Sequence, residues 1–272
     1  MHKYQQAIKW TVYTLLLINF AFYIYEDWSR ALHVLTPDST FLDWTAEFAT
    51  SIDESAWFFL LFMFELETYV LEDKTLAGWV AHTIHSIRIV CYLLLAHTIF
   101  AFTDTISDLQ PTIAVENATS LCDMSEDDVS YVYNLEYTDV DAMSCGGLSS
   151  ATEYYKVADD PVVSDMAGLK LERQHAWADL AEAIIWLLII AAIELTVRLQ
   201  SHGTTSGPVI INATRIKYIL YALLIAIGVW WASLGHWLYF WDELVWIGGF
   251  AAIEMNMSEW RDEIDEEKGV TA

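Results

Sequence analysis

Apolar residues gather in six runs along the chain, with polar stretches between them. The runs cover residues 8–25, 55–71, 80–102, 178–198, 216–240 and 244–258, and the last is the shortest. A helix rises about 1.5 Å per residue, so about 17 to 25 helical residues cross a hydrocarbon core about 30 Å thick. Because unpaired backbone groups are costly in lipid, the pattern predicts six transmembrane helices.

The basic residues predict the orientation of these spans. Lys3 and Lys9 precede the first run, as in a signal peptide, but Tyr25-Glu26-Asp27-Trp28 follows where a cleavage site needs small residues. We therefore predict a retained first span. With the N-terminus inside, nine of the 13 basic residues fall on the cytoplasmic side. Both termini are accordingly predicted in the cytoplasm, and the spans in the cell inner (plasma) membrane.

Residues 104–175 form the one large polar region between spans, which we predict to be extracytoplasmic. This region has 15 acidic and three basic residues and contains Cys122 and Cys145. An oxidising compartment would join these two cysteines in a disulfide. A small folded cap and a flexible acidic loop are both open interpretations of the region. The predicted organisation is spans 1 to 3 in 1–103, this insert in 104–175, spans 4 to 6 in 176–258, and an acidic cytoplasmic tail in 259–272.

Composition narrows the class of protein. The chain has a formal charge of −25, yet 55% of its residues are hydrophobic and its mean hydropathy is +0.32. The hydrophobic content excludes disorder and favours a membrane protein over a soluble one. A polyanionic chain without a cluster of Lys and Arg repels phosphate, so nucleic acid is not an expected partner.

The apolar runs share two sequence patterns. In the even runs, Trp follows an acidic residue by four positions and Glu follows it by twelve. The copies are Asp53, Trp57 and Glu65; Glu182, Trp186 and Glu194; and Asp242, Trp246 and Glu254. In the odd runs, a basic residue follows an Ile directly and Tyr follows the Ile by five. The copies are Ile8, Lys9 and Tyr13; Ile87, Arg88 and Tyr92; and Ile216, Lys217 and Tyr221.

Two three-way registers in alternate runs indicate an internal repeat. The predicted fold class is an all-α polytopic membrane protein, in which six transmembrane helices form three parallel-repeat helical hairpins. A small extracytoplasmic insert lies between helices 3 and 4. Parallel repeats are related by an axis along the membrane normal, so equivalent residues share a depth.

This depth relation brings the repeated glutamates near the basic residues and tyrosines. Each Glu lies about 18 Å below the outer end of its span, in the cytoplasmic half of the core, and the bases begin their spans at the cytoplasmic edge. The sequence therefore predicts one charged layer, either an ion pathway or an ion-pair layer. Its residues are Glu65, Glu67, Glu194, Glu254, Lys9, Arg88, Lys217, Tyr13, Tyr92 and Tyr221.

Two interpretations of the layer are open. Carboxylates within a membrane are costly and by default belong to ion or proton pathways, but symmetric ion pairs could also simply hold the hairpins together. Glu67 departs from the repeat, and it is either an unpaired pathway residue or a glutamate that reaches water at the span end. His97, inside the third span, is a candidate proton relay, although a hydrogen-bonded structural histidine is the commoner case.

The leading functional hypothesis is a channel or transporter that conducts or couples a cation or protons through this layer, with the acidic insert concentrating cations outside. The alternative is a non-catalytic assembly factor, sensor or accessory subunit, which would bind a membrane-protein partner or form a homo-oligomer. A haem or quinone redox enzyme is a third hypothesis, limited by the lack of a histidine partner at the depth of His97. The sequence has no catalytic motif of the soluble type, so we expect no enzyme, cofactor or metal site.

Overall fold

The computed structural model describes residues 2–66, 78–158, 160–201, 204 and 206–267. The chain is mostly helical and divides into two compact units. Residues 1–21, 54–95 and 182–272 form the first, called the helical unit. Residues 22–53 and 96–181 form the second, called the mixed unit because it contains both helices and a sheet.

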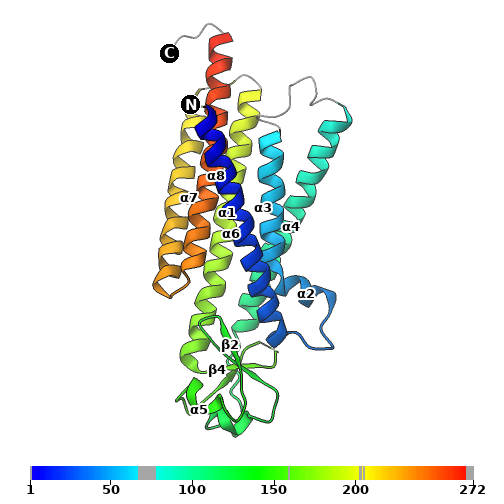
Figure 1. Ribbon diagram of the computed structural model, residues 1–272, viewed down its shortest axis with the longest axis vertical. Coiled ribbons are helices and arrows are strands. Elements are labelled where there is room, and N and C mark those ends of the chain that lie inside the picture. The colour runs from blue at the N-terminus through cyan, green and yellow to red at the C-terminus, as the bar shows by residue number, and fades with distance from the viewer. Residues whose placement is uncertain (1, 67–77, 159, 202–203, 205, 268–272) are drawn as a thin grey trace. The chain divides into compact units, whose positions relative to one another are not determined.

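The helical unit is built from segments of six helices that run alongside one another (Figure 1). It contains α7 (Pro208–Ser233) and α8 (Trp237–Glu267) completely. The other four helices contribute part of their length, and they are α1 (His2–Val34), α3 (Ala49–Glu65), α4 (Trp79–Leu109) and α6 (Met166–Ser201). The first residues of α1 and the last residues of α8 lie at the same end of this unit (Figure 1).

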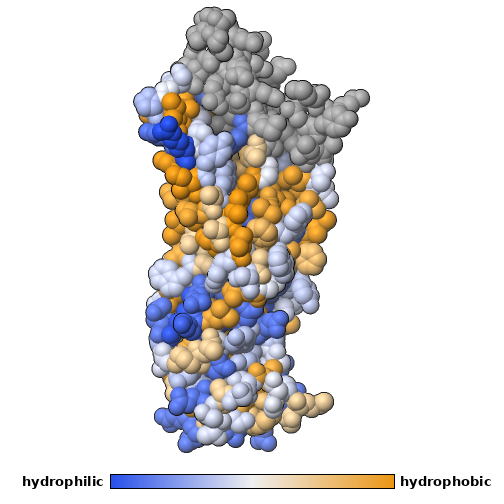
Figure 2. Space-filling view, turned by 90° about the vertical axis from the view of Figure 1, so that its left-hand side faces the viewer, coloured by the Kyte–Doolittle hydropathy of each residue, from blue (hydrophilic) through white to orange (hydrophobic). Residues whose placement is uncertain are grey.

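Hydrophobic side chains lie on the outside of the helical unit as well as in its core. The face of α7 shows this most clearly, with Tyr218 66% exposed and Ile219 61% exposed. Figure 2, in which α7 faces the viewer, shows a band of hydrophobic side chains over the helices. Continuous apolar surface of this kind indicates contact with lipid or with another protein.

Three helices among the described residues are long and apolar enough to cross a membrane. They are α4, α7 and the Met166–Gln200 stretch of α6. The chain is therefore compatible with membrane insertion, as its sequence predicts. The further spans predicted in α1, α3 and α8 stay a prediction.

The mixed unit contains a four-stranded sheet in the order β2-β1-β4-β3. The strands are β1 (Ser130–Tyr133), β2 (Glu136–Asp139), β3 (Tyr155–Lys156) and β4 (Val162–Ser164). The central pair, β1 and β4, is parallel and the outer pairs are antiparallel. Asn134 and Leu135 both have positive φ angles, 56° and 63°, which is the geometry of a two-residue hairpin turn. Of the two interpretations of the acidic insert, the structure has the folded one.

Three short helices complete the mixed unit. They are α2 (Phe41–Glu47), the 3-10 helix η2 (Leu121–Met124) and α5 (Cys145–Leu148). Thr40 and Asp43 form a capping box at the start of α2. Cys122 in η2 and Cys145 in α5 are joined by a disulfide, as predicted.

Two helices extend further than their apolar runs predict. The third run ends at 102 and the fourth begins at 178, but α4 continues to Leu109 and α6 begins at Met166. Leu109 at the end of α4 and Leu169 at the start of α6 pack in one buried cluster with Val132 of the sheet. Arg173 adds a polar link, because its Nε donates to the Leu109 carbonyl at 2.6 Å. Packing on the sheet therefore keeps these polar stretches helical.

Candidate functional site

Arg88 and Tyr92 of α4 meet Glu194 of α6 in the helical unit. Arg88 Nη2 forms an ion pair with Glu194 Oε1, and the Tyr92 hydroxyl donates to the same oxygen at 2.6 Å. Arg88 is buried, and its guanidinium lies over the ring of Phe64 at 4.7 Å from the ring centre. The second carboxylate oxygen of Glu194 faces the exposed Arg198 at 3.7 Å. A base and a Tyr one helical turn apart on α4 thus share one acceptor on α6.

Lys217 and Tyr221 of α7 make similar contacts with Glu254 of α8. Lys217 Nζ lies 2.9 Å from Glu254 Oε1, and the Tyr221 hydroxyl donates to the same oxygen at 3.1 Å. The Lys217 side chain is 5% exposed and that of Glu254 is 23% exposed. Base, Tyr and Glu occupy the aligned sequence positions in both hairpins. These six residues are called the inner layer.

Less can be said of the equivalent residues in α1 and α3. Lys9 lies in α1 and Glu65 at the end of α3, but their side chains are outside the described part of the structure, as is all of Glu67. Tyr13 packs against the core of the helical unit and meets Trp10 edge to face at 6.5 Å. Two of the three predicted groups are therefore described with their partners.

A second set of acidic residues in the helical unit accepts hydrogen bonds from Trp and Asn side chains. The four donor–acceptor pairs are Trp186 Nε1 to Glu243 (3.3 Å), Trp246 Nε1 to both oxygens of Glu54 (3.2 Å each), Trp231 Nε1 to Glu182 (2.9 Å) and Asn19 Nδ2 to Asp242 (2.7 Å). Glu54, Asp242 and Glu243 are all buried. We call these acids and their donors the Trp–acid layer.

Sequence reasoning found this layer only in part. It aligned Asp53, Glu182 and Asp242 but passed over Glu54 and Glu243, the next residues on two of the same helices. Both lie three positions before a repeated Trp, on the same helix face. An acid at this spacing, present in two of three repeats, is the signal that would have found them.

Aromatic side chains fill the space that joins the two layers. Phe250 is fully buried, and its ring contacts Trp186 at 5.3 Å, Trp57 at 5.9 Å and Trp246 at 6.2 Å between ring centres. Trp186, which donates to Glu243, also contacts Tyr221 of the inner layer at 6.3 Å. The carboxylates of the two layers are thus connected through packed rings.

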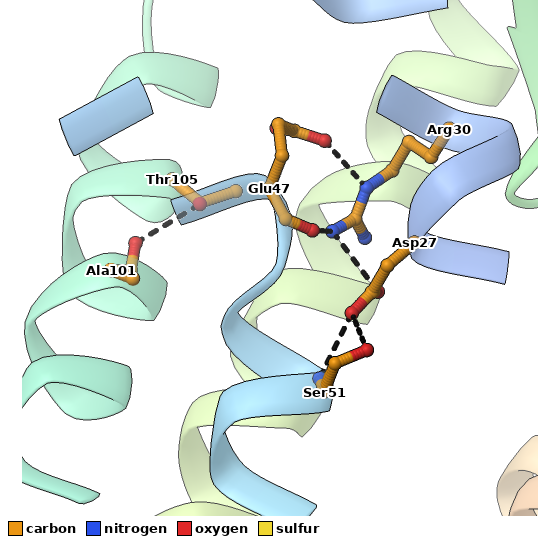
Figure 3. A network of polar contacts seen from close by, with 6 residues as sticks. All are labelled: Asp27, Arg30, Glu47, Ser51, Ala101 and Thr105. Carbon is orange, nitrogen blue, oxygen red and sulfur yellow. Dashed lines mark hydrogen bonds and ion pairs between the residues drawn. The ribbon is translucent and has the colours of Figure 1, made fainter. Parts of the chain in front are cut away.

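A separate polar network lies in the mixed unit, where α1, α2 and α3 meet. Figure 3 shows the guanidinium of Arg30 between Asp27 and Glu47, and Ser51 beside Asp27. Arg30 Nε lies 2.8 Å from Glu47 Oε2, and Asp27 accepts from both the amide and the hydroxyl of Ser51. Although burial opposes it, the two carboxylates hold the pKa of Arg30 above its usual value. Arg30 stays charged and fixes the ends of these helices.

His97 and Cys91 belong to neither layer. His97 is in the part of α4 that belongs to the mixed unit, and its buried Nε2 has no hydrogen-bond partner among the described residues. Cys91 is a buried free thiol in the core of the helical unit.

The described side chains of the helical unit include acids, bases and hydrogen-bond donors. Among them, no group of three or more His, Cys, Asp or Glu residues is arranged to hold a metal ion. What the helical unit offers is carboxylates at two levels, hydroxyl and indole donors, and two buried bases.

Comparison of the chain with protein-family models, with curated proteins and with solved structures found no match.

Proposed function

We propose that the protein is a six-span membrane protein of three repeated hairpins that binds and passes protons by way of the buried carboxyl groups of its helical unit. Two observations support the repeat. Arg88, Tyr92 and Glu194 make the same contacts as Lys217, Tyr221 and Glu254 at aligned positions. The start of α1 and the end of α8 also lie at the same end of the unit, as an even number of crossings requires (Figure 1).

The observation that carries the proposal is the pair of acidic levels on single helices. On α8, Glu243 and Glu254 are eleven residues apart, which is about 17 Å along a helix. On α6, Glu182 and Glu194 are twelve residues, about 18 Å, apart. Each of these carboxylates is bound to a side-chain donor from a neighbouring helix. Acidic groups inside a membrane are costly, and proton or ion pathways are the usual reason to keep them.

The aromatic side chains between the levels favour protons over hydrated ions. Trp57, Trp186 and Phe250 are buried and in ring contact with one another. A hydrated cation could pass only if these rings moved apart. A proton needs a much smaller rearrangement, because it moves along hydrogen bonds or transient waters.

A second candidate function is a non-transporting membrane subunit or assembly factor, in which the inner layer only holds the hairpins together. The observation in its favour is that Glu194 and Glu254 each already have a base and a Tyr as partners. Buried pairs of this kind give conformational specificity in some proteins.

Proton flux into proteoliposomes distinguishes the two functions. We expect the wild-type protein to dissipate an imposed pH gradient, and Glu194→Gln or Glu254→Gln to abolish the flux while the protein still folds, because an amide keeps shape but holds no proton. Glu116→Gln, an exposed change of the same type in the mixed unit, is the matched control and should keep full flux. No flux in the wild type with protons or several cations would favour the second candidate.

A further inference from the structure

We infer that Glu243 is the proton-binding residue of the Trp–acid layer, an assignment that deepens the proposed function and rests on it. Glu243 is 7% exposed, and its Oε1 accepts the indole N–H of Trp186 at 3.3 Å. Its other oxygen, Oε2, is buried and has no hydrogen-bond partner among the described residues. Among the described acids of the two layers, Glu243 is the one with a buried oxygen that has no hydrogen bond.

Two further neighbours of Glu243 are a glycine and an acid. On α7, Gly228 lies against the Glu243 side chain, since a Cβ on Gly228 would come within 3.8 Å of the Glu243 Cβ. Asp242, which directly precedes Glu243 on α8, is a second buried acid. The other glutamates of the Trp–acid layer, Glu182 on α6 and Glu54 on α3, are each bound to a Trp. α8 itself has no Lys or Arg between Trp237 and Trp260.

A bare carboxylate at this position would leave a charged oxygen unsolvated beside a second acid. Such a charge is far more costly to bury than a neutral carboxylic acid. Glu254, on the same helix, shows the alternative solution, because Lys217 and Tyr221 both bind its Oε1. Glu243 has an indole where Glu254 has a base, and an indole stabilises a carboxyl group without supplying a positive charge.

The ligand that fits is a proton and not a metal ion. Ca²⁺ or Mg²⁺ requires about six oxygen ligands, whereas a proton requires one carboxyl oxygen. Among the described residues, no group of three or more His, Cys, Asp or Glu side chains is arranged to hold a metal ion. The free Oε2 of Glu243 therefore matches a proton, which Trp186 would hold in a defined orientation by its bond to Oε1.

Infrared spectroscopy of the full-length protein in liposomes tests this assignment directly. A protonated carboxyl group has a carbonyl stretch above the amide band. We expect such a band in the wild type at neutral pH, its loss in Glu243→Gln, and a shift to higher frequency in Trp186→Phe, which removes the indole donor but keeps the acid. Glu116→Gln, the exposed change in the mixed unit, is the matched control and should leave the band in place.

The outcomes separate this inference from the proposed function. No carboxyl band in the wild type, or a band unchanged in both Glu243→Gln and Trp186→Phe, overturns the assignment even where Glu194 controls flux. Loss of the band in Glu243→Gln together with its shift in Trp186→Phe supports the assignment, even where no flux is found and the transport proposal fails. Because Trp186→Phe retains Glu243, the test stands if Glu243→Gln does not fold.

Discussion

Lys217 and Glu254 form a pair in which the base is the more deeply buried partner, with its side chain 5% exposed against 23% for the acid at an N–O distance of 2.9 Å. Removing the acid alone leaves a buried ammonium without a counter-charge. Glu254→Gln should therefore lower the free energy of unfolding by about 3 kcal/mol, and Lys217→Met combined with Glu254→Met should restore most of it. Denaturant unfolding measures both.

The exposed pair of Arg198 and Glu194 provides the control for this prediction. Arg198 is 78% exposed and 3.7 Å from the carboxylate. Arg198→Ala should cost less than about 1 kcal/mol, because solvent screens an exposed pair. Equal losses for Arg198→Ala and Glu254→Gln would contradict a role for burial in the Lys217 pair.

Gly228 and Gly249 predict opposite effects of the same substitution in two helices of the helical unit. A Cβ on Gly228 would lie 2.9 Å from the ring of Phe240, whereas one on Gly249 would lie 3.6 Å or more from its neighbours. Gly228→Ala should destabilise by about 1 kcal/mol or more through overpacking. Gly249→Ala should stabilise by up to about 1 kcal/mol through helix propensity. Thermal unfolding of both variants side by side checks the signs.

Asp165 predicts how the mixed unit responds to acid. Its carboxylate accepts from the amide of Gly168 at 2.9 Å and from the hydroxyls of Ser149 and Tyr131. Burial opposes the charge, but these hydrogen bonds outweigh burial and hold the pKa of Asp165 below its usual value. Its stabilising contribution is therefore complete above the pKa of the unfolded chain, near 4, and is lost as pH falls through the lower folded pKa.

The matched variant for this prediction is Asp165→Asn. It should reduce the free energy of unfolding at neutral pH by about 1 kcal/mol, the usual worth of a helix-capping residue. It should also flatten the loss of stability below pH 4. An acid limb identical to that of the wild type would show that other carboxylates control it.

The orientation of the chain is open to thiol labelling. Met143 in the insert is 95% exposed, Cys122 and Cys145 are in a disulfide, and Cys91 is buried, so Met143→Cys adds one accessible thiol. A membrane-impermeant maleimide should label it in intact cells, because the insert is predicted outside. Lys268→Cys, in the predicted cytoplasmic tail, should react only after permeabilisation. The reverse pattern would invert the topology.

The spacing of residues in the sequence was enough to predict the contacts between Arg88, Tyr92 and Glu194. Arg88 and Tyr92 lie one turn apart, so both reach the same side of the neighbouring helix, where Glu194 is found. The contact between α6 and α7 could not be predicted in this way. The linear pattern does not say in which order the helices follow one another around the bundle, so the bond from Trp231 to Glu182 had no sequence signal.

The insert was harder still to predict. Its strands have two to four residues, and β1 and β4 pair in parallel although separate chain segments supply them. Strands this short carry too little alternation to be recognised, and a parallel pair depends on long-range packing. The two cysteines were the one local signal that named a contact there.

Ala183 marks the place where we expect the helices of the helical unit to separate first. Trp186 of α6 binds Glu243 of α8, and Trp246 of α8 binds Glu54 of α3. The position on α6 that corresponds to these two acids is Ala183, whose methyl group accepts no hydrogen bond. Between α3 and α6, Trp57 and Trp186 meet through their rings at 5.8 Å, and this contact is called the seam. Slow breathing of the helices, seen as amide hydrogen exchange, should begin along this seam and spread last to α8.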